Sequence, residues 1–175
     1  MAGDLTDIDT RLRRLEDIEE IRELRMKYHY FINEGCSERT AELYTDDAYV
    51  EYEGVVIARG RAELSRSIPS LSRRLTFIKQ FIANHMVEVE GDEATGVAYL
   101  DARYAHDGKS IMATARFSEK YRRTADGWRI SEMICRTYFN VPIEQGWGGA
   151  GLQNFVPLTE EEIADGERRS AEARE

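Results

Sequence analysis

The sequence predicts an α+β domain in which N-terminal helices pack on one face of a curved antiparallel sheet, and three observations support this fold class. Apolar residues recur every three or four positions over residues 5–33, which is the spacing of an amphipathic helix. Four long segments of strand character fill residues 77–139. Pairs of Asp and Gly separate these segments and favour tight hairpin turns, so the strands form an antiparallel meander.

The first helix is predicted from the apolar stripe along residues 5–33, which has charged residues between its members. The stripe consists of Leu5, Ile8, Leu12, Leu15, Ile18, Ile21, Leu24, Tyr28 and Ile32. A break or restart is expected near Asp17, and Gly35 is a suitable stop at the C-terminal end.

The middle of the chain predicts shorter elements. Residues 37–44 favour a short second helix, and residues 48–53 and 55–60 favour a hairpin. Helical character returns over residues 60–74. Pro69 should end or kink that helix, because its ring clashes with the preceding turn.

The C-terminal half predicts four strands at roughly 77–90, 94–106, 109–122 and 127–139. The three connections between them contain Gly91-Asp92, Asp107-Gly108 and Asp126-Gly127. Because the helices precede this run of strands, we expect them to lie on one face of the sheet.

The 175-residue chain is long enough for one core of ordinary size and too short for two domains to be expected. We assign residues 1–140 to the α+β domain and residues 141–175 to a glycine-rich flap followed by a charged tail. In the flap, Trp147 and Phe155 are expected to close an apolar cavity.

Charge and composition exclude several classes of partner. The net charge is −9, so the surface repels phosphate groups, and neither nucleic acid nor an anionic membrane is an expected partner. No apolar run has the length of a signal-peptide core or the ~20 residues that span a bilayer, which makes the cytoplasm the expected location. Cys36 and Cys135 lack metal-like spacing and are expected to be reduced and structural.

Five segments together resemble one known family. They are LEDIEEIRELRMKYHYFINEG, AELYTDDAYVEYEG, ARGRAEL, NHMVEVEGDEATGVAYL and DGWRISEMICR. Their order and spacing over residues 12–139 resemble the SnoaL-like branch of the nuclear-transport-factor-2-like superfamily, which includes scytalone and bile acid dehydratases and formaldehyde-releasing lyases. The resemblance implies a cone-shaped, cystatin-like α+β barrel with a deep apolar pocket, usually no metal or organic cofactor, and a homodimer or homotrimer.

The resemblance also implies site residues. In dehydratase-like members, an aspartate of the first helix and a histidine of the sheet form an acid–base dyad, and tyrosines polarise a substrate oxygen. The matching dyad positions here are Asn33 and Gln80, and the matching tyrosines are Tyr28 and Tyr52. Because an amide has no accessible pKa, neither residue can exchange a proton near neutral pH, and both amides become candidate substrate-binding residues.

His29 is the candidate general base, because it lies four residues before Asn33 and therefore shares a helix face with it. The alternative is a histidine satisfied by nearby glutamates, with Tyr28 in the core and Asn33 capping the helix. His85 is expected on the outer face or at a subunit interface, unless a bulge turns it inward. His106 is expected in solvent beside a turn.

The sheet supplies further candidates. Gln80 and Asn84 share a face by strand alternation and are expected to bind substrate. Tyr99 and Asp101 share a face with Arg103 on the next strand, where Tyr99 would bind a hydroxyl group and Asp101 would act as a base or an orienting group. The alternative is that Asp101 forms a structural pair with Arg103 or Arg116 on a solvated face.

Two arginines are expected to hold a charged or phenolic end of the substrate, because a guanidinium stays charged and donates in a fork. Arg59 precedes the family glycine. Arg136 is expected to share a face with Trp128, Ile130, Ile134 and Tyr138.

These observations favour a cofactor-independent lyase that acts on a hydroxylated aromatic or polycyclic small molecule. The reaction is either retro-aldol release of an aldehyde such as formaldehyde from a diol, or dehydration, since both need one base, oxyanion donors and a dry pocket. Between these two reactions, the amides at both dyad positions favour aldehyde release. The amides at Asn33 and Gln80 favour an alternative, a non-catalytic binding or assembly module. A third reading is the accessory subunit of an aromatic-ring dioxygenase.

Overall fold

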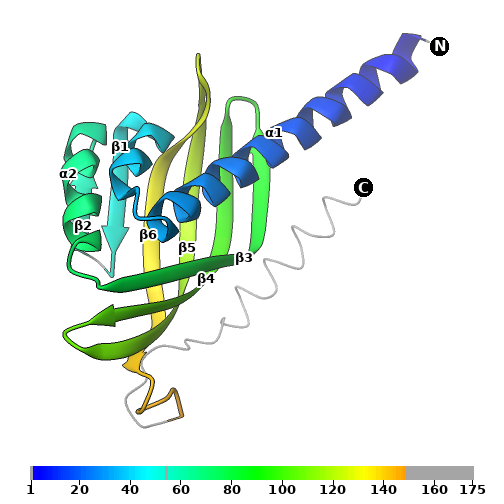
Figure 1. Cartoon of the computed structure of the whole chain (residues 1–175). Coiled ribbons are helices and arrows are strands. Elements are labelled where there is room, and N and C mark those ends of the chain that lie inside the picture. The colour runs from blue at the N-terminus through cyan, green and yellow to red at the C-terminus, as the bar shows by residue number, and fades with distance from the viewer. Residues whose placement is uncertain (1, 54, 149–175) are drawn as a thin grey trace.

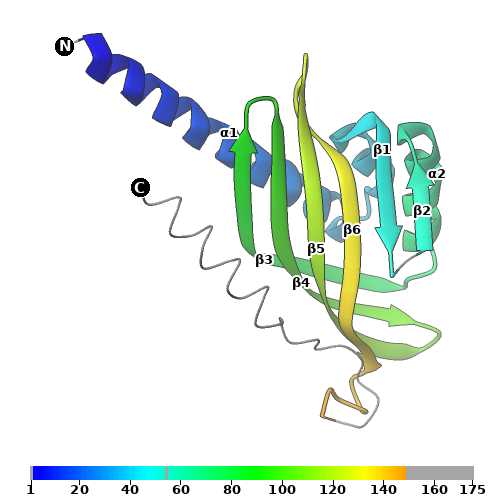
Figure 2. The same cartoon turned by 180° about the vertical axis from the view of Figure 1, so that it is seen from behind.

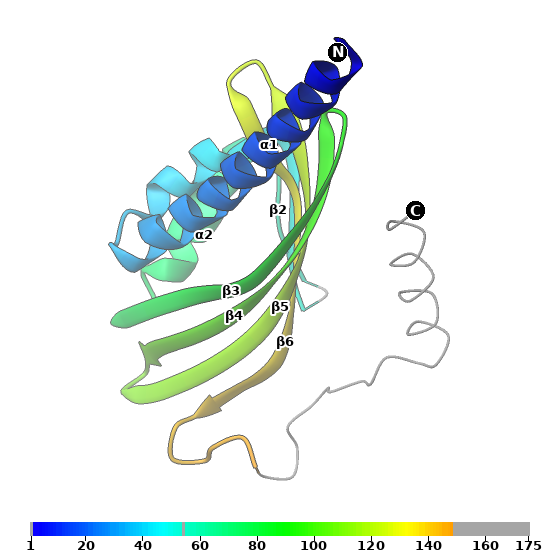
Figure 3. The same cartoon turned by 90° about the vertical axis from the view of Figure 1, so that its right-hand side faces the viewer.

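The computed structural model describes residues 2–53 and 55–148. Its helices are α1 (Ala2–Asn33), the 3-10 helix η1 (Ser37–Leu43) and α2 (Arg61–Ser72). Its strands are β1 (Tyr44–Tyr52), β2 (Val55–Arg59), β3 (Phe77–Glu90), β4 (Glu93–His106), β5 (Lys109–Thr124) and β6 (Gly127–Pro142). The helices lie on the concave side of a strongly curved sheet (Figure 1, Figure 3), so the predicted α+β class is confirmed. Among the described helices, none is both long and apolar enough to cross a membrane.

One sheet contains all six strands in the order β2-β1-β6-β5-β4-β3, and Figure 2 shows it with α1 passing behind it. The predicted hairpins are present, and Asp107 (φ 50°) with Gly108 (φ 73°) makes the left-handed turn between β4 and β5. One pairing departs from the all-antiparallel prediction, because β1 and β6 run parallel. Turn residues indicate pairing only between strands that follow each other in the sequence, so they could not predict the pairing of β1 with β6.

α1 is one continuous helix, so the break predicted near Asp17 does not occur. Asp17 instead joins the helix to the sheet: it accepts a hydrogen bond from Trp128 Nε1 at 3.1 Å and forms an ion pair with Arg123 at 2.7 Å. The part of α1 that precedes Asp17 extends past the body of the molecule (Figure 1).

α2 continues through Pro69 to Ser72, which corrects the prediction that this proline would end the helix. Pro69 lies in the last turn, where its missing N–H removes only the bond to the carbonyl of Ser65. The backbone N–H of Arg73 still donates to the Pro69 carbonyl at 3.0 Å, so the helix closes one turn later.

The core lies between the helices and the concave face of the sheet. Alternate residues of β4 and β5 point toward α1 and are buried, and several of them are alanines. The buried residues of this face on the two strands are Ala94, Gly96, Ala98, Ala102, Ala113, Ala115, Phe117, Glu119 and Tyr121. These small side chains leave room for the large residues of α1 that pack against them.

A shift in the pairing of β3 changes which of its side chains face the helices. The register of β3 against β4 shifts between Ala83 and Met86, and Asn84 there adopts a left-handed φ of 51°. As a result, the His85 ring turns to the concave side, where its side chain is 8% exposed. The expectation of an outward His85 is therefore wrong, because the bulge resets the alternation. Asn84 is exposed at this bulge.

The described part of the predicted flap is short. Trp147 is 59% exposed and stacks on Phe139 of β6, with ring centroids 5.8 Å apart. Residues 149–175, including Phe155, lie outside the described residues. Cys36 and Cys135 are both free thiols, as predicted.

The last turn of α1 is fastened to the edge strand β3 by one side chain. Asn33 Nδ2 donates to the carbonyl of Gln80 at 2.8 Å, and the Gln80 backbone N–H donates to Asn33 Oδ1 at 2.7 Å. Lys79 Nζ also donates to the Asn33 carbonyl at 2.7 Å. The amide thus satisfies backbone groups that an edge strand would otherwise leave unpaired.

Replacing Asn33 with alanine should destabilise the protein by ~1–3 kcal/mol, because both backbone groups of Gln80 lose their partner. Urea denaturation gives the free energy of unfolding, and hydrogen exchange at the Gln80 amide reports the local opening. Asn140→Ala, at an exposed position on β6, is the control. An unchanged exchange rate at Gln80 would contradict this role.

Candidate functional site

His29 is the centre of the candidate site. It lies on the buried side of α1, where only 5% of the residue is exposed, and its Nδ1 is 2.9 Å from Gln80 Oε1. A carbonyl oxygen can only accept, so Nδ1 carries the proton and Nε2 bears the free lone pair. Among the described residues, Nε2 is buried and has no hydrogen-bond partner.

Electrostatics keep His29 neutral. Burial lowers the pKa of His29 well below its usual value, and the positive charge of Arg25, one turn earlier on α1, lowers it further. The hydrogen bond that His29 donates to Gln80 opposes this shift without cancelling it. At neutral pH the side chain is therefore an uncharged base.

Tyr28 lies beside His29 and pairs with a second tyrosine, Tyr52. The Tyr28 hydroxyl is 3.2 Å from the Tyr52 hydroxyl, and the rings of Tyr28 and His29 meet edge to face at 5.1 Å. Burial raises the pKa of Tyr28, although Arg25 and the bond with Tyr52 oppose it, and burial raises the pKa of Tyr52 well above its usual value. Both phenols are therefore neutral hydrogen-bond donors.

A second set of polar groups lies one turn deeper. Arg25 Nε and Glu119 Oε1 form an ion pair at 2.7 Å, and both side chains are 0% exposed. Tyr121 donates its hydroxyl proton to Glu119 at 2.5 Å. His85 Nε2 is 3.1 Å from the same hydroxyl, so His85 must donate to it. Gly96 makes room for this contact, because a Cβ there would lie 3.2 Å from His85 Nε2.

The charges of this second set are mutually dependent. Burial raises the pKa of Glu119, and Arg25 and Tyr121 act against that rise. Burial, the largest single effect, would lower the pKa of Arg25, but Glu119 together with Tyr121, Tyr44 and Tyr28 outweighs it and the pKa is raised. Burial, with Arg25 and Arg22, lowers the pKa of His85 to about 4.

Arg25 also lies close to Tyr28 and His29. Its guanidinium carbon lies 4.8 Å from the ring centroid of Tyr28 and 4.3 Å from that of Phe117. The His29 ring lies 6.3 Å from the Phe117 ring. Arg25 Nη1 and Nη2 are buried and, within the described residues, make no hydrogen bond. The two Nη donors of Arg25 and the Nε2 acceptor of His29 thus have no partner, and both side chains lie near the rings of Tyr28 and Phe117.

The structure brings together five of the predicted site residues, from α1, β1 and β3: Tyr28, His29, Asn33, Tyr52 and Gln80. Asn33 bonds through its amide to the backbone of β3, and only Gln80 Oε1 contacts His29. The two amides therefore position the histidine.

Tyr99 and Asp101 lie on the opposite face of the sheet from this cluster, since they alternate along β4 with the buried Ala98 and Ala102. Asp101 Oδ2 pairs with Arg103 Nη2 at 3.2 Å, and both side chains are about half exposed, at 47% and 50%. This is the structural pair named as the alternative. The structure does not bring Asp101 to His29.

Arg59 and Arg136 are also on the outer face. Arg59 lies over the ring of Tyr49, 4.9 Å from its centroid, and Arg136 pairs with Glu51. The prediction that Arg136 shares a face with Ile130 is wrong. An irregularity where β6 pairs with β5 at Lys120 and Tyr121 breaks the alternation between these two positions. The buried residues of β6 are Trp128, Ile130, Met133, Cys135 and Val141.

Sequence reasoning missed Arg25 and Glu119. Arg25 lies on the apolar stripe of α1, one turn from Ile21 and Tyr28, and Glu119 alternates with Phe117 and Tyr121 on β5. A charged residue on each apolar face was the available signal, because buried charges occur in pairs.

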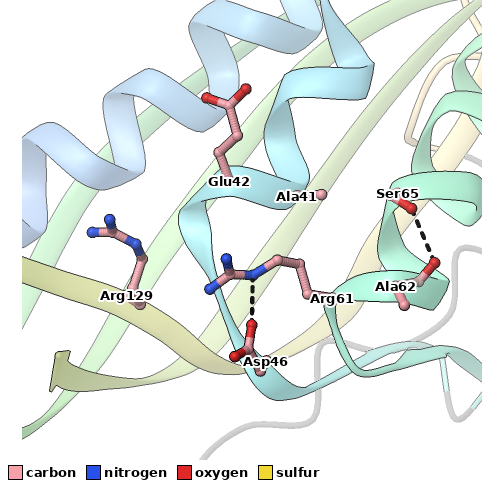
Figure 4. Close-up of a pocket in the computed structure, with 7 residues that line it drawn as sticks. All are labelled: Ala41, Glu42, Asp46, Arg61, Ala62, Ser65 and Arg129. Carbon is pink, nitrogen blue, oxygen red and sulfur yellow. Dashed lines mark hydrogen bonds and ion pairs between the residues drawn. The ribbon is translucent and has the colours of Figure 1, made fainter. Parts of the chain in front are cut away.

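Two surface pockets lie near these elements. A groove of about 280 Å³ runs between α1 and β3 and is lined by residues that include Arg25, Asn84 and His85. A wider pocket of about 650 Å³ lies between η1, α2 and β6, and in Figure 4 Arg61 points to Asp46 across it. Its charged side chains are of both signs, so it favours no single ligand class. No group of three or more potential metal-binding side chains occurs among the described residues.

Comparison with known proteins agrees with this architecture. A family model described as a SnoaL-like domain matches residues 13–134. The uncharacterized protein Rv2910c of Mycobacterium tuberculosis is 23% identical over 124 residues, which cover 69% of this chain and 84% of that protein.

Solved structures show the same fold. Hexachlorocyclohexane dehydrochlorinase LinA-type3 from Novosphingobium barchaimii matches with a TM-score of 0.68 and 21% identity, over 85% of this chain and 99% of that one. An NTF2-like protein with a cystatin-like fold from Novosphingobium aromaticivorans matches with a TM-score of 0.62 and 28% identity, over 88% and 97%. The predicted nuclear-transport-factor-2-like, cystatin-like fold is therefore confirmed.

The buried histidines predict a loss of stability in mild acid. The pKa values of His29 and His85 are lowered in the folded state, so below pH ~6.5 the unfolded chain binds protons that the folded chain rejects. His85 alone should lower the free energy of unfolding by up to ~1.4 kcal/mol per pH unit between pH ~6.5 and about 4, and His29 adds to this slope. Urea denaturation at several pH values measures the slope. His85→Gln should reduce it. A slope indifferent to this substitution would contradict the burial of a neutral His85.

Proposed function

Because this chain belongs to the SnoaL-like domain family, we propose that it is a lyase whose base is His29. The observation that carries the proposal is the buried, unpartnered Nε2 of His29 beside the Tyr28–Tyr52 pair. A buried neutral imidazole with its other nitrogen fixed is arranged to accept one proton from a bound molecule.

The substrate class follows from the groups around His29. We propose a hydroxylated aromatic or polycyclic molecule with a carbonyl group next to the carbon that loses its proton. Arg25 Nη1 and Nη2 have donors to offer the carbonyl oxygen as it gains negative charge. The rings of Tyr28 and Phe117, which flank Arg25, suit a flat apolar ligand.

In the favoured reaction, His29 Nε2 removes the proton from the α-carbon and the electron pair forms a double bond to the β-carbon. The bond from the β-carbon to its hydroxyl oxygen breaks. That oxygen takes a proton from the Tyr28–Tyr52 pair and leaves as water. The imidazolium then returns its proton to the phenolate, so the overall reaction is loss of water.

Retro-aldol cleavage uses the same groups in another order. His29 takes the proton of the β-hydroxyl group, the bond between the α- and β-carbons breaks, and an aldehyde leaves. The resulting enolate oxygen lies at Arg25, and the His29 imidazolium returns its proton to the α-carbon. We favour dehydration, because the LinA-type3 neighbour is named a dehydrochlorinase and dehydrochlorination is also an elimination. Its 21% identity supports the fold, and the chemistry is our proposal for this chain.

A non-catalytic binding module is the second candidate. Asn33 and Gln80 occupy the dyad positions and are used to hold α1 on β3. In that case the unpaired groups of Arg25 and His29 would hydrogen-bond a ligand without turnover. Binding without product formation would identify this function.

The test is a panel of aromatic β-hydroxy ketones and aromatic diols, with dehydration followed by absorbance of the conjugated product and cleavage followed by released aldehyde. His29→Gln should lower kcat by ~10²-fold or more, since the base is lost, and Tyr28→Phe should lower it by a similar factor. Because the pKa of His29 is lowered, kcat/KM should stay level from pH 8 down to at least pH 6.5.

Tyr30→Phe is the matched control, because Tyr30 lies on the same helix and is 61% exposed. It should leave turnover unchanged. Turnover that survives His29→Gln would show that another group is the base.

A further inference from the structure

The N-terminal part of α1 carries an apolar stripe that nothing in the described residues covers. Ile8, Leu12 and Leu15 are 53%, 50% and 63% exposed. Their spacing of four and three residues places them on one side of the helix. Figure 1 and Figure 3 show this part of α1 extending beyond the sheet.

A projecting helix of this kind needs support. Isolated helices shorter than ~12–15 residues are marginal in water, because most helical stability in proteins comes from packing an apolar face. The exposed ion pairs Asp7–Arg11 (3.8 Å) and Asp9–Arg13 (3.6 Å) are between side chains that are 66–77% exposed. Such pairs contribute only ~0.3–0.5 kcal/mol each. The exposed stripe of Ile8, Leu12 and Leu15 is therefore expected to pack against a partner surface.

The charges around the stripe are separated by sign. Asp7 and Asp9 lie before position 10, and Arg11, Arg13 and Arg14 follow it. We infer that this segment, residues 7–15, pairs antiparallel with the same segment of a second copy, about a two-fold axis between positions 11 and 12. Each acidic end then lies along the basic end of the other copy. Ile8 of one copy meets Leu15 of the second, and the two Leu12 side chains meet near the axis.

The antiparallel direction follows from charge and from shape. Parallel pairing would place the aspartates of one copy beside those of the other, and likewise the arginines, which is unfavourable. It would also bring both bodies to the same end of the helix pair, whereas antiparallel pairing separates them. A two-fold axis makes the contact self-complementary and closed, so it produces a dimer.

The contact is short, so association should be weak and sensitive to salt. A standard interface buries ~800 Å² per partner, which is more than one short helix segment supplies. We therefore expect a monomer–dimer equilibrium on the order of micromolar, weakened by raising salt from 50 mM to 500 mM as exposed charges are screened.

The test is sedimentation velocity of the full chain over a concentration series. Variant A carries Arg11→Asp, Arg13→Asp and Arg14→Asp, and variant B carries Asp7→Arg and Asp9→Arg. Each should be monomeric alone, because its segment has one sign of charge. An equimolar mixture of A and B should dimerise again. This recovery also shows that neither variant lost its association by failing to fold.

Leu12→Asp should weaken the wild-type dimer by at least 10-fold. Met26→Asp is the control, because Met26 is a similarly exposed apolar residue (55%) on the part of α1 that packs on the sheet. A wild-type chain that stays monomeric at 100 μM, or variants A and B that dimerise alone as the wild type does, would overturn the inference.

Discussion

The attachment of the last turn of α1 to the edge strand β3 is the constraint on which the site depends. Asn33 pairs with both backbone groups of Gln80, and the Gln80 side chain bonds to His29 Nδ1. One short segment of β3 therefore fixes the end of the helix, the direction of the imidazole and its tautomer. The two amides that replace the expected acid–base pair act as supports, and the histidine one turn earlier becomes the candidate base.

The buried Arg25–Glu119 pair sets the electrostatics of this region. Both side chains are fully buried, and such a pair seldom adds stability over an apolar replacement, although removing one partner alone is costly. Its effect here is local: the charge of Arg25 helps to keep His29 and His85 neutral. Glu119 binds Arg25 Nε and the Tyr121 hydroxyl, which leaves the Nη atoms of Arg25 without a hydrogen-bond partner among the described residues. The buried Arg25 guanidinium thus supplies hydrogen-bond donors near His29, the candidate base.

Features that depend on residues close in the sequence, such as turns and helices, could be predicted. Features that depend on pairing between distant segments could not. Asp-Gly turns located the four hairpin strands to within a few residues, and helical spacing located both long helices. Strand alternation did not survive the irregularities at Asn84 and near Ile130, because one extra residue moves every later side chain to the other face. For that reason His85 was expected outside and Arg136 inside. The pairing of Arg25 with Glu119, and of β1 with β6, joins positions about ninety residues apart that share no turn.

The most direct test is the protonation state of His29, measured by long-range proton–nitrogen correlation spectra of protein with ¹⁵N-labelled histidine between pH 6.5 and 8. The ring should be neutral with the proton on Nδ1 throughout this range, because Gln80 Oε1 accepts that proton and burial disfavours the charge. A ring that carries its proton on Nε2, or that becomes a cation near pH 6.5, would contradict this assignment.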